Sequence, residues 1–270
     1  MQIKNNIWKQ QSAKETLFIK KYDHSHVFEK VALIHEQLEL IEFPYIIPLK
    51  KTDEPLLLVQ SWQKNSYSAD FSKAKHRKSA VKILKSLHKR NEKIDWNSFN
   101  VIPKQKLLQK WNARLERFLF NEKELVKYLG HQYYDIVIYA NKVLKKIRNS
   151  PGKNSKKQTL LHGDVVHHNF LMTKDGMKLI DFDLAVIGDA AEEMILWMHR
   201  ALPAMDYHIE QLLSEHSYLQ VCLPKLHYLQ YPNELLREWQ YVLQLGDYEK
   251  EAFLEYIMPF TENALRHWPE

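Results

Sequence analysis

Apolar positions in the first 62 residues predict a small unit of strands and one helix. Two strands are expected at roughly 6–10 and 16–22, because the second, TLFIKKY, is rich in apolar and aromatic residues. The run PLLLVQSW at 55–62 predicts a further short strand. The helix is expected at 26–41, where apolar residues recur at amphipathic spacing: Val27, Val31, Ile34, Leu38 and Ile41. The order strand, strand, helix, strand indicates a small α+β unit.

From about residue 70 the pattern changes to long helices. Helices are expected at 70–90, 107–119 and 122–146, followed by a Lys/Ser-rich loop around Gly152. A brief β interlude at 159–183 comes next, and then helices rich in Trp, Tyr and Leu. The sequence therefore predicts a β-rich N-terminal part and a larger, mostly helical C-terminal part.

The composition, 45% hydrophobic and 27% charged over 270 residues, is that of a globular protein with a substantial core. The single cysteine, Cys222, cannot form an internal disulfide, and we expect it to be buried. The first 15 residues lack the apolar core of a signal peptide, and no run approaches the ~18 apolar residues of a membrane helix. These features favour a cytoplasmic protein without membrane insertion.

The net charge of +6 is unevenly distributed. Residues 1–150 hold 29 Lys/Arg against 15 Asp/Glu, and residues 151–270 hold 10 against 18. A basic half can attract an anion such as a nucleotide or a nucleic acid, although lysines on helices commonly form solvated faces. We do not expect nucleic acid to be the partner; that interpretation would require strongly salt-dependent affinity.

The segment LLHGDVVHHNFLMTKDGMKLIDFDLA, residues 160–185, holds the candidate chemistry. Two short apolar strands, Phe170–Met172 and Met177–Ile180, are joined by TKDG, a turn whose glycine can take positive φ. Such a hairpin holds Asn169 and Asp181 at the same end of adjacent strands. Both side chains can therefore bind one ion.

An amide and a carboxylate oxygen suit Mg²⁺, which prefers hard oxygen ligands and keeps several waters. Asp164 lies on the loop before the hairpin, where it can orient and deprotonate a hydroxyl. Phosphoryl transfer needs mainly this positioning and the neutralisation of phosphate charge. The pattern predicts Asp164 as the catalytic base and Asn169 and Asp181 as metal ligands.

Two motifs lie in this segment: HGDxxxxN at 162–169, and LIDF at 179–182, in which an apolar residue and any residue precede DF. Together they resemble the signature of the aminoglycoside phosphotransferase/choline kinase superfamily. WNARLERF and HGDVVHHN are most similar to the spore-coat CotS-type kinase-like proteins. The resemblance implies an α+β, bilobal protein-kinase-like fold. It also implies a nucleotide-binding lobe at 1–62 and a helical lobe at 63–270 that carries the catalytic loop and metal hairpin. The implied activity is transfer of a phosphoryl group from ATP, with Mg²⁺, to a hydroxyl of a small molecule.

The same resemblance assigns further site residues. TLFIKKY is similar to the strand that carries the phosphate-binding lysine, which would be Lys20. Its glutamate partner would come from the following helix, where Glu29 and Glu36 are candidates and Glu36 is favoured. LLLVQSW resembles the strand that leads into the adenine hinge. The hinge residues would be Gln60, Ser61 and Trp62.

Three departures from related proteins affect the interpretation. Gly163 stands where protein kinases have an arginine that senses activation-loop phosphorylation, so a small hydroxyl compound is favoured over a protein substrate. All six glycines lie at or after Gly130, although the family often has glycine in a phosphate loop before the lysine strand. In GDAAEEM, Glu193 stands where a shorter aspartate usually braces the catalytic loop.

Two other interpretations stay open. The first is a kinase-fold structural or binding protein, associated with a spore-coat assembly, with weak or no activity; the glycine-free N-terminal part favours it. The second is a metal hydrolase, because His167 and His168 together with His162, Asp164 and Asp181 resemble a hydrolase cluster; these residues lack metal-ligand spacing. The C-terminal aromatic residues are interpreted as core and as the wall of an acceptor cleft, where acidic groups would suit a cationic acceptor.

Overall fold

The structure is a computed structural model that describes residues 2–149 and 158–267. The chain forms two compact units, which are described separately. Unit 1 comprises residues 1–105 and 157–193, and unit 2 comprises residues 106–156 and 194–270. The segment with the candidate site residues thus packs with the N-terminal part of the chain, and the functional division at 62/63 stays a prediction. The loop expected around Gly152 lies outside the described residues.

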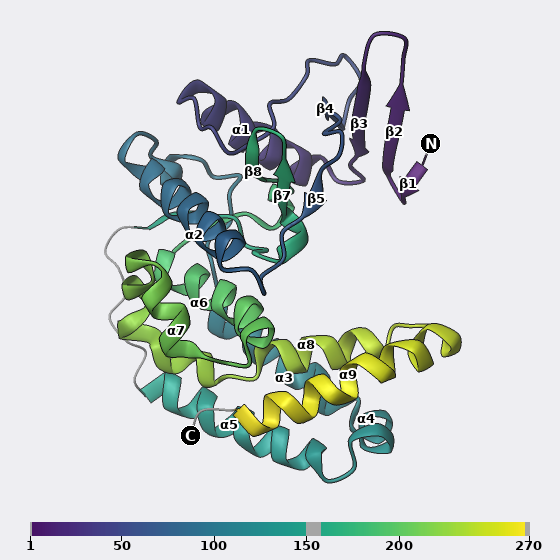
Figure 1. Ribbon diagram of the computed structural model, residues 1–270, viewed down its shortest axis with the longest axis vertical. Coiled ribbons are helices and arrows are strands. Elements are labelled where there is room, and N and C mark those ends of the chain that lie inside the picture. The colour runs from purple at the N-terminus through teal and green to yellow at the C-terminus, as the bar shows by residue number, and fades with distance from the viewer. Residues whose placement is uncertain (1, 150–157, 268–270) are drawn as a thin grey trace. The chain divides into compact units, whose positions relative to one another are not determined.

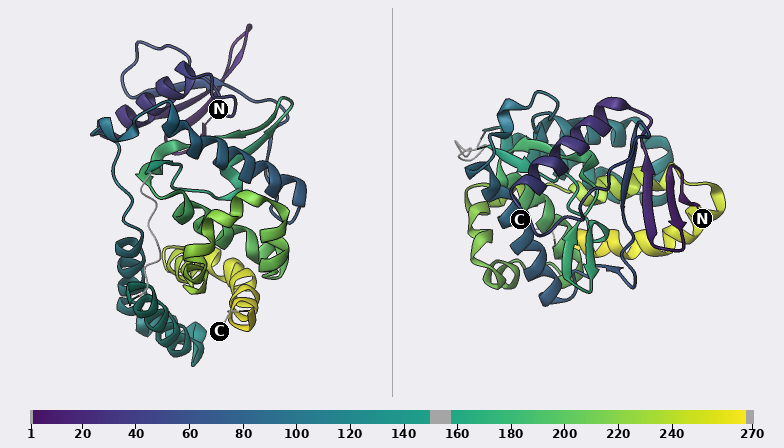
Figure 2. Two further views of the ribbon diagram at one scale, coloured as in Figure 1. Left: turned by 90° about the vertical axis from the view of Figure 1, so that its left-hand side faces the viewer. Right: turned by 90° about the horizontal axis from the view of Figure 1, so that it is seen from above.

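Unit 1 contains a four-stranded antiparallel sheet in the order β1-β2-β3-β4 (Figure 1; Figure 2, right). Its strands are β1 (Gln2–Lys4), β2 (Ile7–Gln11), β3 (Thr16–Lys21) and β4 (Leu57–Ser61). The last three agree with the predicted strands to within two residues. β1 was missed, because three residues are too few to show an alternating pattern. Lys20 of β3 pairs with Ile7 of β2 on one side and with Leu58 of β4 on the other.

The tight turn between β1 and β2 is made by Asn5 and Asn6. Asn6 has φ of +61°, a left-handed conformation that asparagine tolerates better than most residues with a side chain. Its Nδ2 donates to Oδ2 of Asp23 at 2.8 Å, and its carbonyl accepts from the N–H of Lys21 at 2.9 Å. Asparagine thus allows a segment without glycine to turn tightly.

Helix α1 (Ser25–Leu40) follows β3 and agrees with the predicted helix to within one residue. Of the expected apolar side chains it buries Val31, Ile34 and Leu38, whereas Val27 is only half-buried, and it also buries Lys30 and His35. It packs against β4 and against the 3-10 turn Phe182–Leu184. The helix therefore presents one face to the segment that follows the predicted metal hairpin.

The rest of unit 1 holds the segment with the candidate site residues. The elements are β5 (Tyr67–Ser68), α2 (Ala74–His88), β6 (Thr159–Leu161), β7 (Phe170–Thr173), β8 (Gly176–Leu179) and β9 (Val186–Gly188), with 3-10 turns at Lys89–Glu92, Trp96–Ser98 and His167–Asn169. The sheet order is β5-β7-β8, and β6 pairs with β9. The predicted hairpin is confirmed as β7–β8, and Gly176 in its turn has φ of +102°.

The described part of unit 2 is built of helices. They are α3 (Leu107–Phe120), α4 (Glu122–Leu129), α5 (Gln132–Asn149), α6 (Ala190–Ala201, which begins in unit 1), α7 (Ile209–Glu215), α8 (Asn233–Val242) and α9 (Asp247–His267), with 3-10 segments at Leu202–Met205 and Ser217–Gln230. α3 packs against α5 and α8, and α8 packs against α9 (Figure 1). Trp111 is fully buried and stacks on Tyr231, with ring centroids 4.6 Å apart.

The single helix predicted at 122–146 was wrong, because the chain breaks it into α4 and α5. Gly130 takes φ of +52° at the end of α4, a conformation that ends a helix and that glycine adopts at little cost. Cys222 is buried as expected. In the described part of the chain, none of the helices combines the length and apolar character needed to span a membrane.

Candidate active site

One face of the four-stranded sheet lines a cavity of about 540 Å³ in unit 1. Alternate side chains of a strand point to the same face, so Phe18, Lys20 and Tyr22 all lie at this cavity. Leu58 and Gln60 line it from β4 for the same reason. The volume falls within the range of about 300–1,000 Å³ that is typical of small-molecule pockets.

The three predicted hinge residues, Gln60, Ser61 and Trp62, also lie at this cavity. Gln60 is buried, and its Nε2 donates to the carbonyl of Ile47 at 2.6 Å. The N–H of Trp62 donates to the carbonyl of Thr16 at 2.9 Å, which ties the segment after β4 to the start of β3. The wall at the end of β4 is therefore anchored by buried and main-chain hydrogen bonds.

The side chain of Glu193 holds the loop that carries Asp164. The N–H of Gly163 donates to Oε1 of Glu193 at 2.7 Å, and Oε2 lies 2.8 Å from Nε2 of His88. Burial alone would raise the pKa of Glu193, but the hydrogen bond and charge of His88 hold that pKa below its usual value. The longer glutamate side chain thus makes the brace expected at this position.

Gly163 is required by backbone geometry. Its φ is +80°, and a Cβ placed there would lie 1.9 Å from the carbonyl oxygen of Leu184. The neighbouring His162 joins the loop to the hairpin: its Nδ1 accepts from the N–H of Asp164 at 3.4 Å, and its Nε2 contacts the carbonyl of Ile180 at 2.9 Å. His162 is fully buried, so it positions the loop.

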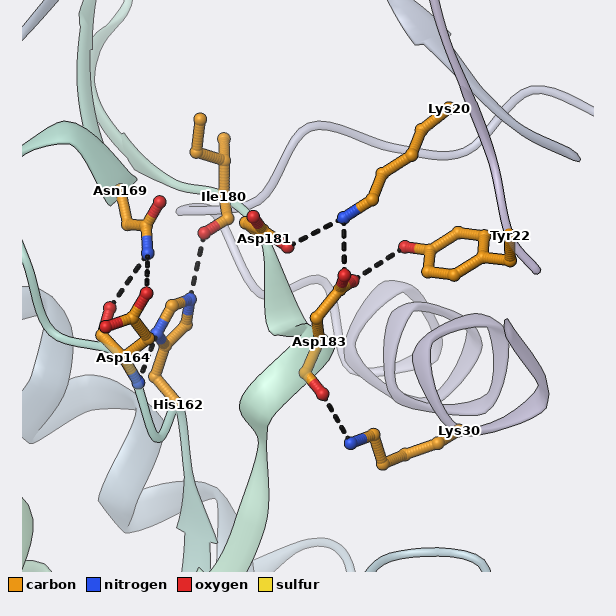
Figure 3. A network of polar contacts seen from close by, with 9 residues as sticks. All are labelled: Lys20, Tyr22, Lys30, His162, Asp164, Asn169, Ile180, Asp181 and Asp183. Carbon is orange, nitrogen blue, oxygen red and sulfur yellow. Dashed lines mark hydrogen bonds and ion pairs between the residues drawn. The ribbon is translucent and has the colours of Figure 1, made fainter. Parts of the chain in front are cut away.

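The structure brings Asp164 and Asn169 together and places Asp181 at the same end of the hairpin (Figure 3). Asn169 immediately precedes β7, and the N–H of Ile180 donates to its carbonyl at 3.0 Å just before Asp181. Nδ2 of Asn169 donates to both the carbonyl and Oδ2 of Asp164, at 2.9 and 3.2 Å. The backbone of the hairpin therefore places the three residues at one end, and binding of one ion by Asn169 and Asp181 stays a prediction.

The chemistry of this group fits a magnesium ion. Because Nδ2 of Asn169 is bonded to Asp164, the oxygen Oδ1 is the atom of that amide available as a ligand. The carboxylate of Asp181 is 44% exposed and can also accept an ion. Both are hard oxygen donors, and water and phosphate oxygens would complete an octahedron. In the described residues, no three His, Cys, Asp or Glu side chains gather as a metal cluster.

Lys20 faces this group from β3. Its Nζ contacts Oδ1 of Asp181 at 3.0 Å and Oδ2 of Asp183 at 2.6 Å (Figure 3). Burial lowers the pKa of Lys20, but the charge of Asp181 and the hydrogen bond to Asp183 outweigh burial and raise that pKa above its ordinary value. Lys20 is therefore a charged ammonium group at the cavity wall.

The expected pairing of Lys20 with a helix glutamate is corrected by the structure. Glu36 and Glu29 are exposed on α1, whereas Val31 and His35 are the α1 residues that line the cavity. A helix turns by about 100° per residue, so the side chain that follows His35 points away from the cavity. Asp183, not Glu36, supplies the second carboxylate to Lys20.

Sequence reasoning gave no role to Asp183, Tyr22 or Lys30. The first stands in the IDFD motif, and the second follows Lys20 by two residues, so strand alternation could have placed it at the cavity. No pattern marked Lys30, whose burial depends on how α1 packs. The missed strand β1 also contributes Ile3 and Lys4 to the cavity wall.

Residues 68–211 match the model of the phosphotransferase enzyme family (APH), which covers more than half of the chain. The chain belongs to this family. A comparison with curated protein sequences gives no match.

Solved structures of kinases share the fold. The AMP-bound spectinomycin phosphotransferase APH(9)-Ia aligns with a TM-score of 0.69 and 15% identity, over 98% of this chain and 92% of that chain. An aminoglycoside phosphotransferase from Alicyclobacillus acidocaldarius gives 0.62 and 15%, over 98% and 89%. The choline kinase LicA from Streptococcus pneumoniae gives 0.57 and 13%, over 96% and 90%. The predicted α+β, kinase-like fold is therefore confirmed.

Proposed function

We propose that the protein is an ATP- and Mg²⁺-dependent phosphotransferase that acts on a hydroxyl of a small molecule. The observation that carries the proposal is the grouping of Asp164, Asn169 and Asp181 at one end of the β7–β8 hairpin, with Lys20 facing them. Family membership supports the class of reaction. A spectinomycin phosphotransferase of the same fold has been solved with ADP and spectinomycin, which supports a nucleotide and a small acceptor.

Each residue has a distinct role in this proposal. Asp164 would orient the acceptor hydroxyl and take its proton. Asn169 and Asp181 would hold the divalent ion, whose charge offsets that of the phosphates. Lys20 would bind the α- and β-phosphates. The adenine would lie against the wall made by Gln60, Ser61 and Trp62.

Two features bear on the kind of acceptor molecule: the length of the segment between Asp183 and α6, and the net charge of residues 151–270. Only a short segment separates Asp183 from α6, which begins at Ala190, so there is no long activation loop to hold a protein substrate. Residues 151–270 also carry an excess of negative charge, 18 Asp/Glu against 10 Lys/Arg. These features favour a cationic hydroxyl compound. A screen in which anionic sugars are the preferred acceptors would argue against this choice.

The second candidate is a kinase-fold structural or binding protein, as the resemblance to CotS-type spore-coat proteins suggests. The direct ion pair between Lys20 and Asp181 favours it, because this pair occupies the carboxylate proposed to bind the ion. Under this proposal the protein is associated with a spore coat, whereas the phosphotransferase would act in the cytoplasm.

Thermal stability with and without Mg-ATP separates the two candidates. A ligand at 100 times its dissociation constant stabilises a protein by about 2.7 kcal/mol. The phosphotransferase should show such stabilisation with millimolar Mg-ATP, and Asp181→Asn should lose it. Wild-type protein whose unfolding midpoint does not move with Mg-ATP would favour the structural candidate.

A further inference from the structure

Three donors converge on Asp183, the residue two positions after the proposed metal ligand Asp181 (Figure 3). Nζ of Lys20 lies 2.6 Å from Oδ2, and the hydroxyl of Tyr22 donates to Oδ1 at 2.8 Å. Nζ of Lys30 donates to the backbone carbonyl of Asp183 at 2.6 Å. Each acceptor atom of Asp183 thus has its own donor. Lys20 of β3 and Tyr22, which follows β3, hold the two carboxylate oxygens, and Lys30 of α1 holds the carbonyl.

Asp183 and Asp181 differ in what they can do for Lys20. Asp181 makes the longer contact, 3.0 Å, and its side chain is 44% exposed. The Asp183 side chain is 30% exposed, makes the 2.6 Å contact and is fixed by Tyr22 as well. A divalent ion bound at Asp181 would draw that carboxylate away from the lysine, and Asp183 would then keep Lys20 in place.

Tyr22 contributes twice to this arrangement. Its hydroxyl fixes the carboxylate of Asp183, and Nζ of Lys20 lies 5.0 Å from the centroid of its ring, within the range of a cation–π contact. Lys20 is therefore enclosed by an anionic group and an aromatic face that are bonded to each other. This gives the ammonium a defined direction toward the cavity.

Helix α1 offers no acidic side chain to Lys20. The α1 residues that line the cavity are Val31 and His35, and the His35 ring packs edge-on against Phe182 at 5.5 Å. The helix acts instead through Lys30, which holds the backbone of Asp183. The family resemblance implies a helix carboxylate that pairs with the lysine. Here α1 instead supplies the cation Lys30, and the segment after β8 supplies the carboxylate of Asp183.

We propose that Asp183, held by Tyr22 and Lys30, is the positioning residue for Lys20 and takes the role that family resemblance assigns to a helix glutamate. This inference rests on the proposed function in that Lys20 is taken to contact phosphate. It predicts that loss of Asp183 weakens recognition of the triphosphate and leaves recognition of the nucleoside unchanged.

The test compares binding of Mg-ATP and of adenosine by titration calorimetry. Asp183→Asn should weaken Mg-ATP binding about tenfold, as expected for loss of one charge-assisted hydrogen bond, with adenosine affinity unchanged. Tyr22→Phe keeps the ring and should give a smaller loss. Glu36→Gln and the matched surface control Asp175→Asn, on the exposed β7–β8 turn, should bind both ligands as wild type does. A variant at Glu36 that weakens Mg-ATP, or Asp183→Asn with unchanged Mg-ATP affinity, would overturn the inference.

A second measurement separates this inference from the proposed function. Acetylation of Lys20 by a water-soluble reagent, followed by mass spectrometry without nucleotide, reports how firmly the ammonium is held. Labelling of Lys20 should increase several-fold in Asp183→Asn and not in Glu36→Gln. If wild-type protein fails to bind nucleotide, the phosphotransferase proposal fails. The labelling then still shows whether Asp183 holds Lys20 in place. If Asp183→Asn does not fold, Tyr22→Phe takes its place, and unchanged labelling there overturns the inference.

Discussion

The backbone N–H of Gly163 donates to the buried carboxylate of Glu193 at 2.7 Å, although 30 residues separate the two in the chain. This bond ties the loop that carries Asp164 to the first turn of α6. The other oxygen of Glu193 contacts His88 of α2, so two elements distant in the sequence fix the position of the loop that carries Asp164. The geometry of the site therefore depends on one buried carboxylate.

Removal of this carboxylate should destabilise the protein. Glu193→Ala removes the acceptor of the Gly163 N–H and the contact with Nε2 of His88, and it should lower the free energy of unfolding by about 3 kcal/mol. Glu193→Gln keeps an oxygen for Gly163 and should cost less. Urea denaturation of the two variants measures the difference. Equal stability of Glu193→Ala and wild type would show that the brace is not needed.

Gly163 should tolerate no side chain. Gly163→Ala brings a Cβ to 1.9 Å from the Leu184 carbonyl at φ of +80°, so the backbone must move and both stability and activity should fall. Gly130→Ala is the matched control, since it also has positive φ but has no atom within 4 Å of the added Cβ. The control should carry only the cost of a side chain in a sparsely populated backbone region, about 1–3 kcal/mol. Comparison of the two unfolding midpoints tests this; a Gly163→Ala variant as stable as the control would be inconsistent with the close contact.

Two buried histidines predict a loss of stability in mild acid. Burial lowers the pKa of His35 and of His199 to about 4. The unfolded chain takes up protons at these residues as the pH falls below about 6.5, and the folded protein does so only near 4. The contribution of these histidines to the free energy of unfolding is therefore fully present above about pH 6.5. Between about pH 6.5 and 4 it falls by about 1.4 kcal/mol per pH unit for each histidine. His199→Gln should flatten the dependence between pH 6.5 and 4, as measured by denaturation at several pH values; an unchanged slope would show that His199 does not contribute.

Asp164→Ala tests the proposed base. The Asn169 amide keeps its 2.9 Å bond to the backbone carbonyl of residue 164, so the hairpin should fold as before. Turnover should fall by about 10²–10⁴, the contribution typical of general-base catalysis, while Mg-ATP affinity changes little. Transfer of labelled γ-phosphate to a panel of aminoglycosides, choline and sugars measures it. Activity equal to that of wild type would remove Asp164 from the mechanism.

Local patterns predicted the part of the site that lies close together in the chain. Asn169 and Asp181 flank a hairpin, and a hairpin brings its ends together whatever the rest of the fold does. The strand that carries Lys20 was also predicted, because TLFIKKY is rich in apolar and aromatic residues. Its register with β4 then placed the hinge residues at the same cavity.

Features that depend on packing could not be predicted in this way. Glu36 was favoured as a partner because it lies on the helix after Lys20, but the rotation of α1 about its axis decides which side chains face the cavity. Asp183 acquired its role through contacts with β3 and α1, which lie more than 150 residues earlier in the chain. The short strand β1 was missed for lack of length.

The central claim is that Asn169 and Asp181 bind a divalent ion together with a nucleotide. Calorimetric titration of ATP into the protein, with and without Mg²⁺, tests it most directly in wild type and in Asp181→Asn. We expect Mg²⁺ to strengthen ATP binding to the wild type by about tenfold or more and to have little effect on the variant. ATP affinity that is independent of Mg²⁺ in the wild type, or equally dependent on it in both proteins, would contradict the account.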